Sequence, residues 1–308
     1  MLPYYLIMNR VFQFLMSFLL MALFSINLLG QELHKYFEIK HAKAIDKIDL
    51  NVSTKAGKSF LNSVDSDAPL LILGASENDV AASTFKIEEI QNTQKVDADL
   101  TCKSHMGLNF TESVAGSIFS SDEKPSDMWQ LNLSEHITFN LSLNYLMGEA
   151  NVDLSRLAIE RLKIKSGSAD VRLRYSDKMM NSVAMDTFFV KVNFGNIYVE
   201  DLNYSMAKDV IAEVGFGNLS IDCGKDWKIN SRINASVGAG NLNIILPPDE
   251  LPVIIRIHDS PLCNIKMADN FKKIGHNAFS NQAYIDNPEN SMEFILDVGM
   301  GSIAFKTK

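Results

Sequence analysis

The sequence predicts an all-β fold: a single-stranded parallel β-solenoid (β-helix-like) with Gly-x-Gly-Asn turns, preceded by a signal peptide. Two observations predict the solenoid: a seven-residue phrase that occurs six times between residues 148 and 305, and a strand-like alternation of apolar and polar residues inside each copy. Repetition at intervals of roughly 20–50 residues is typical of solenoids, in which each repeat packs on its neighbours. The copies begin at Gly148, Gly167, Asn193, Gly215, Gly238 and Gly299.

Each position of the phrase has a mechanical reason. The first is Gly or Asn, which adopt positive φ at low cost, so we expect a left-handed residue there. The third is Gly or Ala, which lets another backbone pass close by. The fourth is Asn, Asp or Ser, whose side chains hydrogen-bond neighbouring groups and hold the turn closed. The fifth and seventh are apolar, which predicts a strand with one buried face.

The sixth position of each copy is predicted to face outward; these residues are Asp153, Arg172, Tyr198, Ser220, Asn243 and Ala304. Successive copies begin 19, 26, 22, 23 and 61 residues apart, which suits coils of two or three short strands, with two ordinary coils and an insertion in the last interval. The competing fold is an antiparallel sandwich whose hairpins share Gly-x-Gly turns. We favour the solenoid because a sandwich does not require the same phrase at every turn.

Residues 1–30 predict export. Arg10 precedes an apolar run, residues 11–29, that is interrupted by four polar side chains. This pattern is typical of a signal peptide, and the alternative is an uncleaved N-terminal anchor, because the run is long for a signal. We therefore expect a periplasmic or cell-surface protein, with peripheral or N-terminal membrane association.

Residues 31–128 are predicted to form an N-terminal β cap region. An open solenoid end exposes unpaired strand edges, which need covering. Ile48 to Val52 alternates like a strand, the segment from Ile87 to Leu100 fits a helix or a strand, and the stretch from Thr111 to Asp127 has the composition of an exposed loop.

Residues 129–308 are predicted to form the repeat β-solenoid. Leu154 to Ile164 fits a helix or strands, and we favour strands because only 19 residues separate the first two copies. The segment from Ile265 to Gly275 is the best candidate for a helix or an irregular insertion. Strands without the phrase are expected in Trp129–Met147, Leu251–Ile257 and Met292–Leu296.

Composition restricts the function. The net charge is −8, which disfavours nucleic acid as a partner, because phosphates need clustered Lys and Arg. Three cysteines are too few for a disulfide scaffold, and a bridge between Cys223 and Cys263 is left open.

No catalytic, metal-binding or cofactor-binding residue is predicted. Gly215-Phe-Gly217 lacks the third Gly and the following helix of a dinucleotide site. His258-Asp259-Ser260 has the residue types of a hydrolase triad, but adjacent residues cannot converge on one point. Asp170 suggests calcium between coils, yet the other copies carry Asn or Ser, which favours hydrogen-bonded stacking. Tyr198 and Tyr204 are the candidates for stacking on sugars, although scattered aromatics are common on surfaces.

The segment from Leu146 to Leu173, LMGEANVDLSRLAIERLKIKSGSADVRL, resembles bacterial toast-rack domains. These occur at the C-terminus of LiaF-type cell-wall-active antibiotic response proteins and in related putative-adhesin domains of unknown function. The resemblance extends over roughly residues 129–245 and implies an extracytoplasmic β-solenoid with a non-catalytic envelope role, in some members the regulation of stress signalling. This sequence lacks the several transmembrane helices of LiaF-type proteins, so direct control of a membrane sensor kinase is not expected.

The leading functional hypothesis is an exported non-enzymatic β-solenoid of the bacterial cell envelope that binds or senses an envelope protein or polysaccharide. The alternative is an adhesin or structural surface protein whose coils act as a spacer. A carbohydrate-active enzyme is the least supported class, because the outward positions contain no cluster of acids.

Overall fold

The computed structural model describes residues 34–40, 45–75, 83–101, 127–259 and 261–307. The predicted signal peptide or anchor at residues 1–30, and residues 111–126 of the predicted loop, lie outside them. His34 to Lys308 form one compact unit.

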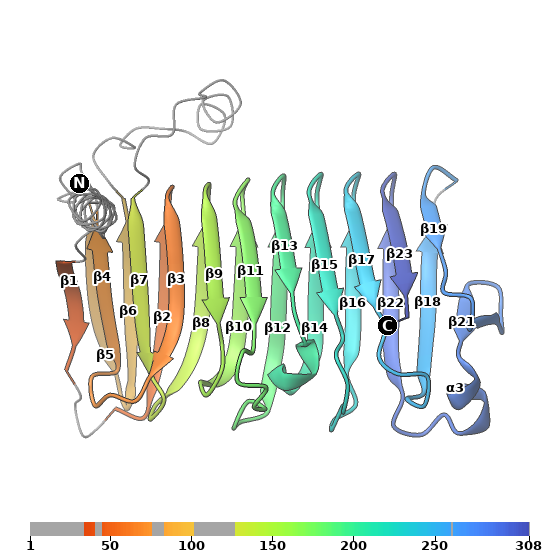
Figure 1. The fold of residues 1–308 in the computed structure, drawn as a ribbon, viewed down its shortest axis with the longest axis horizontal. Helices are drawn as coiled ribbons and strands as arrows, with labels where there is room; N and C mark the ends of the chain where they lie inside the picture. The colour runs from red at the N-terminus through yellow and green to blue at the C-terminus, as the bar shows by residue number, and fades with distance from the viewer. Residues whose placement is uncertain (1–33, 41–44, 76–82, 102–126, 260, 308) are drawn as a thin grey trace, which may run out of the picture. The chain divides into compact units, whose positions relative to one another are not determined.

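The described strands form two sheets that face each other across one hydrophobic core (Figure 1). We call them the short-strand sheet and the long-strand sheet. The short-strand sheet has the order β1-β4-β7-β3-β9-β11-β13-β15-β17-β23-β19, and the long-strand sheet has the order β20-β21-β18-β22-β16-β14-β12-β10-β8-β2-β6-β5.

The short-strand sheet consists of β1 (His34–Ile39), β3 (Lys58–Val64), β4 (Leu70–Ala75), β7 (Met128–Ser134), β9 (Glu149–Asp153), β11 (Asp170–Arg174), β13 (Asn196–Val199), β15 (Asn218–Asp222), β17 (Asn241–Ile245), β19 (Asn264–Lys266) and β23 (Ser302–Lys306). The long-strand sheet consists of β2 (Lys47–Thr54), β5 (Thr84–Ile90), β6 (Thr93–Leu100), β8 (Thr138–Tyr145), β10 (Ala158–Ser166), β12 (Met185–Val192), β14 (Ala207–Val214), β16 (Arg232–Val237), β18 (Val253–Asp259), β20 (Lys272–Lys273), β21 (Ala278–Ser280) and β22 (Met292–Val298). A 3₁₀ turn, η2 (Leu202–Ser205), and one short helix, α3 (Gln282–Asp286), complete the described elements.

From β8 to β17 the chain winds regularly. Each coil is a strand of the long-strand sheet, a tight corner, a strand of the short-strand sheet and a return loop. Neighbouring coils pair in parallel in both sheets. The prediction of stacked parallel coils is therefore confirmed, with two strands per coil, and the antiparallel sandwich is not observed in this region.

The third position of the phrase is a point of close approach, as predicted. A Cβ atom placed on Gly217, Gly240 or Gly301 would lie well inside 3.0 Å of a carbonyl oxygen of the preceding corner. The same carbonyl accepts a hydrogen bond from the fourth residue of the phrase: Asn241 donates its N–H to Gly217 O at 3.0 Å. The corners are therefore closely packed backbone on backbone, which excludes larger side chains.

The fourth position forms a ladder of side-chain hydrogen bonds. Asn196 donates its amide to Asp170 at 2.6 Å, and Asn218 donates to Asn196 at 2.8 Å. Asn241 then donates to Asn218 at 2.7 Å, and the Ser302 hydroxyl donates to Asn241 at 2.5 Å. The expected hydrogen-bonded stacking is observed.

The prediction of a left-handed first position is wrong. Of the described glycines with positive φ, only Gly148 begins a copy of the phrase. At Gly215, Gly238 and Gly299 an added Cβ would lie 3.1 Å from a carbonyl oxygen of the neighbouring corner. Glycine is favoured there because space is short, and the backbone conformation does not require it.

The first copy is displaced by two residues from its predicted alignment. Val152, the fifth residue of its copy, pairs with Leu173, the seventh residue of the next. Gly148, with a φ of 91°, stands where later copies have their third residue. Asp153, predicted to face outward, is only 9% exposed, and its carboxylate accepts hydrogen bonds from Ser155.

The coils at both ends of the stack are out of sequence order. Coil β2–β3 lies between β8–β9 and β6–β7, and coil β22–β23 lies between β16–β17 and β18–β19. The interval between Gly238 and Gly299 spans two turns of the solenoid, one to the corner of β18–β19 and one to the corner of β22–β23, together with an insertion, as predicted. The antiparallel pairs of the described strands all occur at these ends, where they cover parallel edges.

The structure decides between helix, strand and irregular structure in three segments where the sequence fitted more than one of them. Ala158–Ser166 is a strand, as we favoured, and the segment from Ile87 to Leu100 belongs to β5 and β6. The segment from Ile265 to Gly275 is an irregular insertion with short strands and no helix. Cys223 is buried and Cys263 partly exposed, and they form no disulfide with each other.

Candidate functional site

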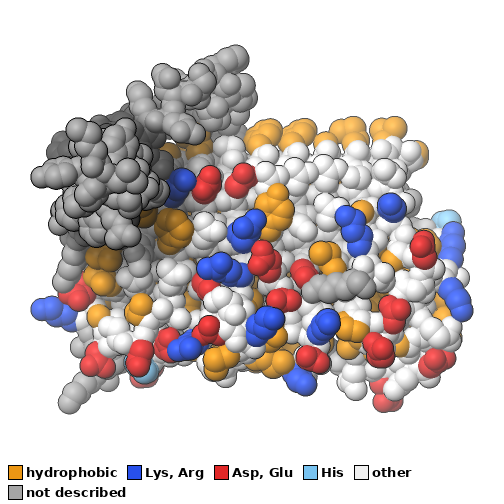
Figure 2. Space-filling model, viewed as in Figure 1, with side chains coloured by type: hydrophobic (Ala, Val, Ile, Leu, Met, Phe, Trp, Pro, Cys, Tyr) orange, Lys and Arg blue, Asp and Glu red, His pale blue; other side chains and the backbone are white. Residues whose placement is uncertain are grey.

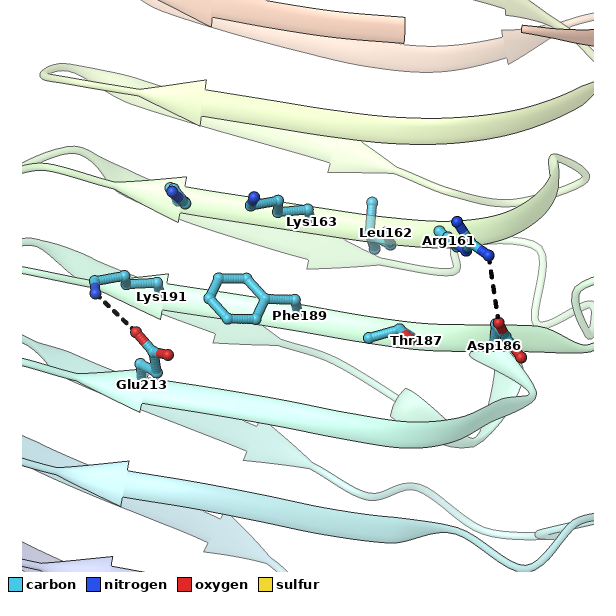
Figure 3. A pocket seen from close by; sticks show the side chains of 9 residues that line it. Arg161, Leu162, Lys163, Asp186, Thr187, Phe189, Lys191 and Glu213 are labelled. Carbon is cyan, nitrogen blue, oxygen red and sulfur yellow. Dashed lines mark hydrogen bonds and ion pairs between the residues drawn. The ribbon is translucent and has the colours of Figure 1, made fainter. Parts of the chain in front are cut away.

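An open groove of about 620 Å³ lies on the outer face of the long-strand sheet, across β10, β12 and β14 (Figure 3). The groove is lined mainly by the side chains that alternate with core-facing residues such as Ile164 and Phe188. Strand periodicity therefore places one set of residues in the core and the other set in the groove. The charged and aromatic lining residues are Arg161, Lys163, Lys165, Asp186, Phe189, Lys191 and Glu213.

Parallel register brings the basic residues together. Lys163 pairs with Phe189, and Lys165 pairs with Lys191, on adjacent strands about 4.8 Å apart. The Lys163 Nζ atom lies 5.8 Å from the centroid of the Phe189 ring, within the range of a cation–π contact. Figure 3 shows the side chains of these two strands side by side.

Only part of the positive charge is balanced within the groove. Arg161 lies 3.7 Å from Asp186, and Lys191 lies 2.7 Å from Glu213. Both pairs are substantially exposed, so each stabilises the fold by about 1 kcal/mol or less. Among the described residues, no carboxylate forms an ion pair with Lys163 or Lys165.

The groove is therefore a local exception to the charge of the chain. Its lining contains four cationic and two anionic side chains, a net charge of +2, whereas the whole chain carries −8. A concave surface of one sign concentrates ligands of the opposite sign. Together with a partly exposed aromatic ring, this arrangement suits an anionic ligand that also presents an apolar face.

The predicted outward residues lie on the other sheet. Arg172, Tyr198, Ser220 and Asn243 occupy neighbouring positions on the outer face of the short-strand sheet. Arg172 lies 5.7 Å from the Tyr198 ring centroid and 3.4 Å from Glu200, so its charge is already balanced.

Tyr204, the second aromatic candidate for stacking on sugars, does not lie on this face. Its ring packs against the core and lies 6.2 Å from the ring of Tyr175. Tyr198 is 41% exposed and is the one of the two that a ligand can reach.

The sequence contained a signal for the groove. Arg161, Lys163 and Lys165 alternate with apolar residues, and Phe189 and Lys191 do the same in the next long strand. Each run by itself is an ordinary exposed strand face. The cluster appears only once the register between these strands is known, because the repeated phrase lies outside them.

The motifs set aside in the sequence lie on ordinary elements of the fold, and Ser260 lies outside the described residues. Among the residues that the structure describes, no group of three or more His, Cys, Asp or Glu side chains is placed to hold a metal ion. Gly215 and Gly217 belong to a corner, and His258 lies on β18. No helix in the described part of the chain has the length and hydrophobicity that a membrane span requires.

Known proteins resemble this chain in sequence and in structure. The model of the family described as the N-terminal domain of toast_rack, DUF2154, matches residues 30–195. Among solved structures, a "putative cell adhesion protein" from Clostridium sporogenes ATCC 15579 is similar with 18% identity and a TM-score of 0.43, over 90% of this chain and 100% of that chain. No match was found among curated proteins. Since the family match covers more than half of the 308 residues, the chain belongs to the toast-rack N-terminal domain family.

Proposed function

We propose that this protein is an exported, non-enzymatic β-solenoid of the bacterial cell envelope that binds an anionic envelope polysaccharide in the groove across β10, β12 and β14. The observation that carries the proposal is the pair of uncompensated cations, Lys163 and Lys165, beside Phe189 in an acidic chain. Export is supported by the apolar run at residues 11–29.

The chemistry of the groove favours a polymer with carboxylates or phosphates. The two lysines offer point charges that attract anions without demanding one geometry, and Phe189 offers an apolar surface for the face of a sugar ring. Because the groove is open and its cations are exposed, binding should weaken as salt screens these charges.

The test is a titration of the full chain with polygalacturonate, a soluble anionic glycan, and with neutral dextran. The variant Lys163→Gln/Lys165→Gln removes the two unpaired charges, and Lys225→Gln/Lys228→Gln makes the same charge change at exposed positions outside the groove. We expect the groove variant to lose about fivefold to thirtyfold in affinity, at about 0.5–1 kcal/mol for each of the two charges, and the control to retain it. Equal binding of dextran, or an equal loss in the control, would refute the proposal.

The alternative is an adhesin or structural surface protein. It is supported by the uninterrupted parallel pairing of coils from β8 to β17, which suits a spacer. This alternative predicts self-association or surface display that does not depend on Lys163 and Lys165. Light scattering of the wild type and of the groove variant separates the two functions.

A further inference from the structure

The second residue of each corner lies in the turn that joins a long strand to a short strand. In the last five coils these residues are Phe194, Phe216, Ala239, Met300 and Leu262. The backbone hydrogen bonds of the corners keep them in register: Phe216 N donates to Asn193 O at 2.7 Å, and Met300 N donates to Gly238 O at 2.7 Å. They therefore form a single row, which we call the apolar corner row.

The apolar corner row is exposed. Its four large members, Phe194, Phe216, Met300 and Leu262, are 49%, 67%, 64% and 72% exposed. The rings of Phe194 and Phe216 are stacked, with centroids 5.4 Å apart and planes at 6°. Figure 2 shows hydrophobic side chains along the edge where the corners of β13 to β23 lie in Figure 1.

The corners that carry the row are uncharged. The five corners, residues 193–196, 215–218, 238–241, 299–302 and 261–264, contain no Asp, Glu, Lys or Arg. The two preceding corners differ, because their fourth-position residues are Glu149 and Asp170. Charge is thus absent from the part of the edge that carries the apolar side chains, so covering this part requires no desolvation of an ionic group.

The row by itself does not supply the whole area of an ordinary protein interface, so a protein partner would also have to cover polar surface beside it. Its four large side chains expose on the order of 400–500 Å², whereas a stable complex buries about 800 Å² on each partner. A lipid bilayer sets no such minimum, since apolar tips enter the interfacial region by about 5–10 Å and aromatic rings are favoured there. Five coils at about 4.8 Å spacing give a row about 19 Å long, parallel to the stacking direction.

We propose that the apolar corner row is a membrane-docking edge that enters the interfacial region of an uncharged, zwitterionic bilayer and holds the stacking direction of the coils in the plane of the membrane. The edge is separate from the groove, which lies on the outer face of the long-strand sheet. The two surfaces leave each other accessible, so a membrane-docked protein still presents Lys163 and Lys165.

The test reports on the row itself, because the apolar run at residues 11–29 of the full chain can bind lipid independently. Phe216→Trp places a fluorophore on the row, and Met179→Trp places one at a 52% exposed position in the return loop at the opposite end of the strands. Each full-length variant is mixed with phosphatidylcholine vesicles that carry brominated acyl chains. The wild type supplies the background of Trp129 and Trp227.

We expect brominated lipid to quench and blue-shift the added fluorescence of the Phe216→Trp variant, and to leave that of the Met179→Trp variant unchanged. Combining Phe216→Trp with Phe194→Ser and Met300→Ser should abolish the quenching. Combining it with Lys163→Gln/Lys165→Gln should preserve the quenching, which separates this proposal from the function of the groove.

Absence of quenching in the Phe216→Trp variant would overturn the proposal. A blue shift without vesicles that grows with protein concentration would also overturn it, because the row would then be covered by a second copy of the chain.

Discussion

Replacing Gly240 with valine tests whether the corners stack as closely as the structure shows. A Cβ atom on Gly240 would overlap the carbonyl oxygen of Gly217, and it would lie 2.7 Å from Val214 Cγ1 and 2.9 Å from the carbonyl carbon of Phe216. Two of these obstacles are backbone atoms of a hydrogen-bonded coil and cannot rotate away. The corner must therefore move outward.

The cost of that movement follows from the contacts that it disturbs. Gly240 N donates to Gly215 O at 2.8 Å, and Asn241 N donates to Gly217 O at 3.0 Å. Weakening both bonds costs about 1–3 kcal/mol, and forcing extra carbon into a packed site costs about 1–3 kcal/mol more. We therefore expect Gly240→Val to lower the free energy of unfolding by about 4 kcal/mol. Gly240→Ala should cost less, because Ala169 fills the third position of its own corner.

The assay is thermal unfolding followed by circular dichroism, with Ala239→Val as the matched control. Ala239 is the exposed tip of the same corner, so the control adds the same kind of bulk without a collision. We expect Gly240→Val to lower the melting temperature by about 10 °C and the control to lower it by less than about 2 °C. Equal melting temperatures for the two variants would refute the stacking argument.

Two further predictions concern buried polar groups, one in a return loop and one at the end of β9. Asn181 accepts the N–H of Ile159 at 2.9 Å and donates to the Ile159 carbonyl at 2.6 Å. Asn181→Ala leaves both backbone groups unsatisfied and should lower the free energy of unfolding, measured in urea, by about 2–4 kcal/mol. A decrease below about 1 kcal/mol would contradict this. Burial raises the pKa of Asp153, but hydrogen bonds from Ser176 and Ser155 outweigh it and hold the pKa below its ordinary value of 3.8. The stability that this carboxylate contributes is therefore present above about pH 4 and is lost as the pH falls through its folded-state pKa. Asp153→Asn should flatten the acid limb of the melting temperature against pH, and an unchanged limb would count against the carboxylate.

The corner was predictable from sequence because its chemistry is local. A small residue for close approach and an amide for hydrogen bonding recur within seven residues, and the structure uses both at Gly240 and Asn241. The role of the first residue was not predictable from sequence. Glycine is favoured both where a Cβ atom would collide with a neighbour and where φ is positive, and only the structure distinguishes the two causes. Gly148 shows the same ambiguity: it matched the first position in sequence but stacks with the third.

The groove was less predictable because it depends on register between strands that carry no repeated phrase. Lys163 and Phe189 are 26 residues apart, and nothing local indicates that they are cross-strand neighbours. Register can be inferred once the corners are aligned, since the number of residues between a long strand and its corner is constant.

The order of coils at the two ends illustrates a limit of periodicity. A repeat constrains each coil to pack on a neighbour, but any parallel coil offers the same hydrogen-bonding edge, so spacing does not say which neighbour it is. At the C-terminal end the chain leaves β17, forms β18 and β19, and then returns with β22 and β23 between them and the preceding coil. The coil β18–β19 is thereby placed outermost, where β21 pairs antiparallel with β18 on the long-strand sheet.

This order of coils brings Leu262 into line with Met300 and extends the apolar corner row by one coil. It does so although the corner of Leu262 has a cysteine, Cys263, at the third position, where the other corners have Gly or Ala. The row therefore arises from the way the end of the stack is closed, as well as from the repeat.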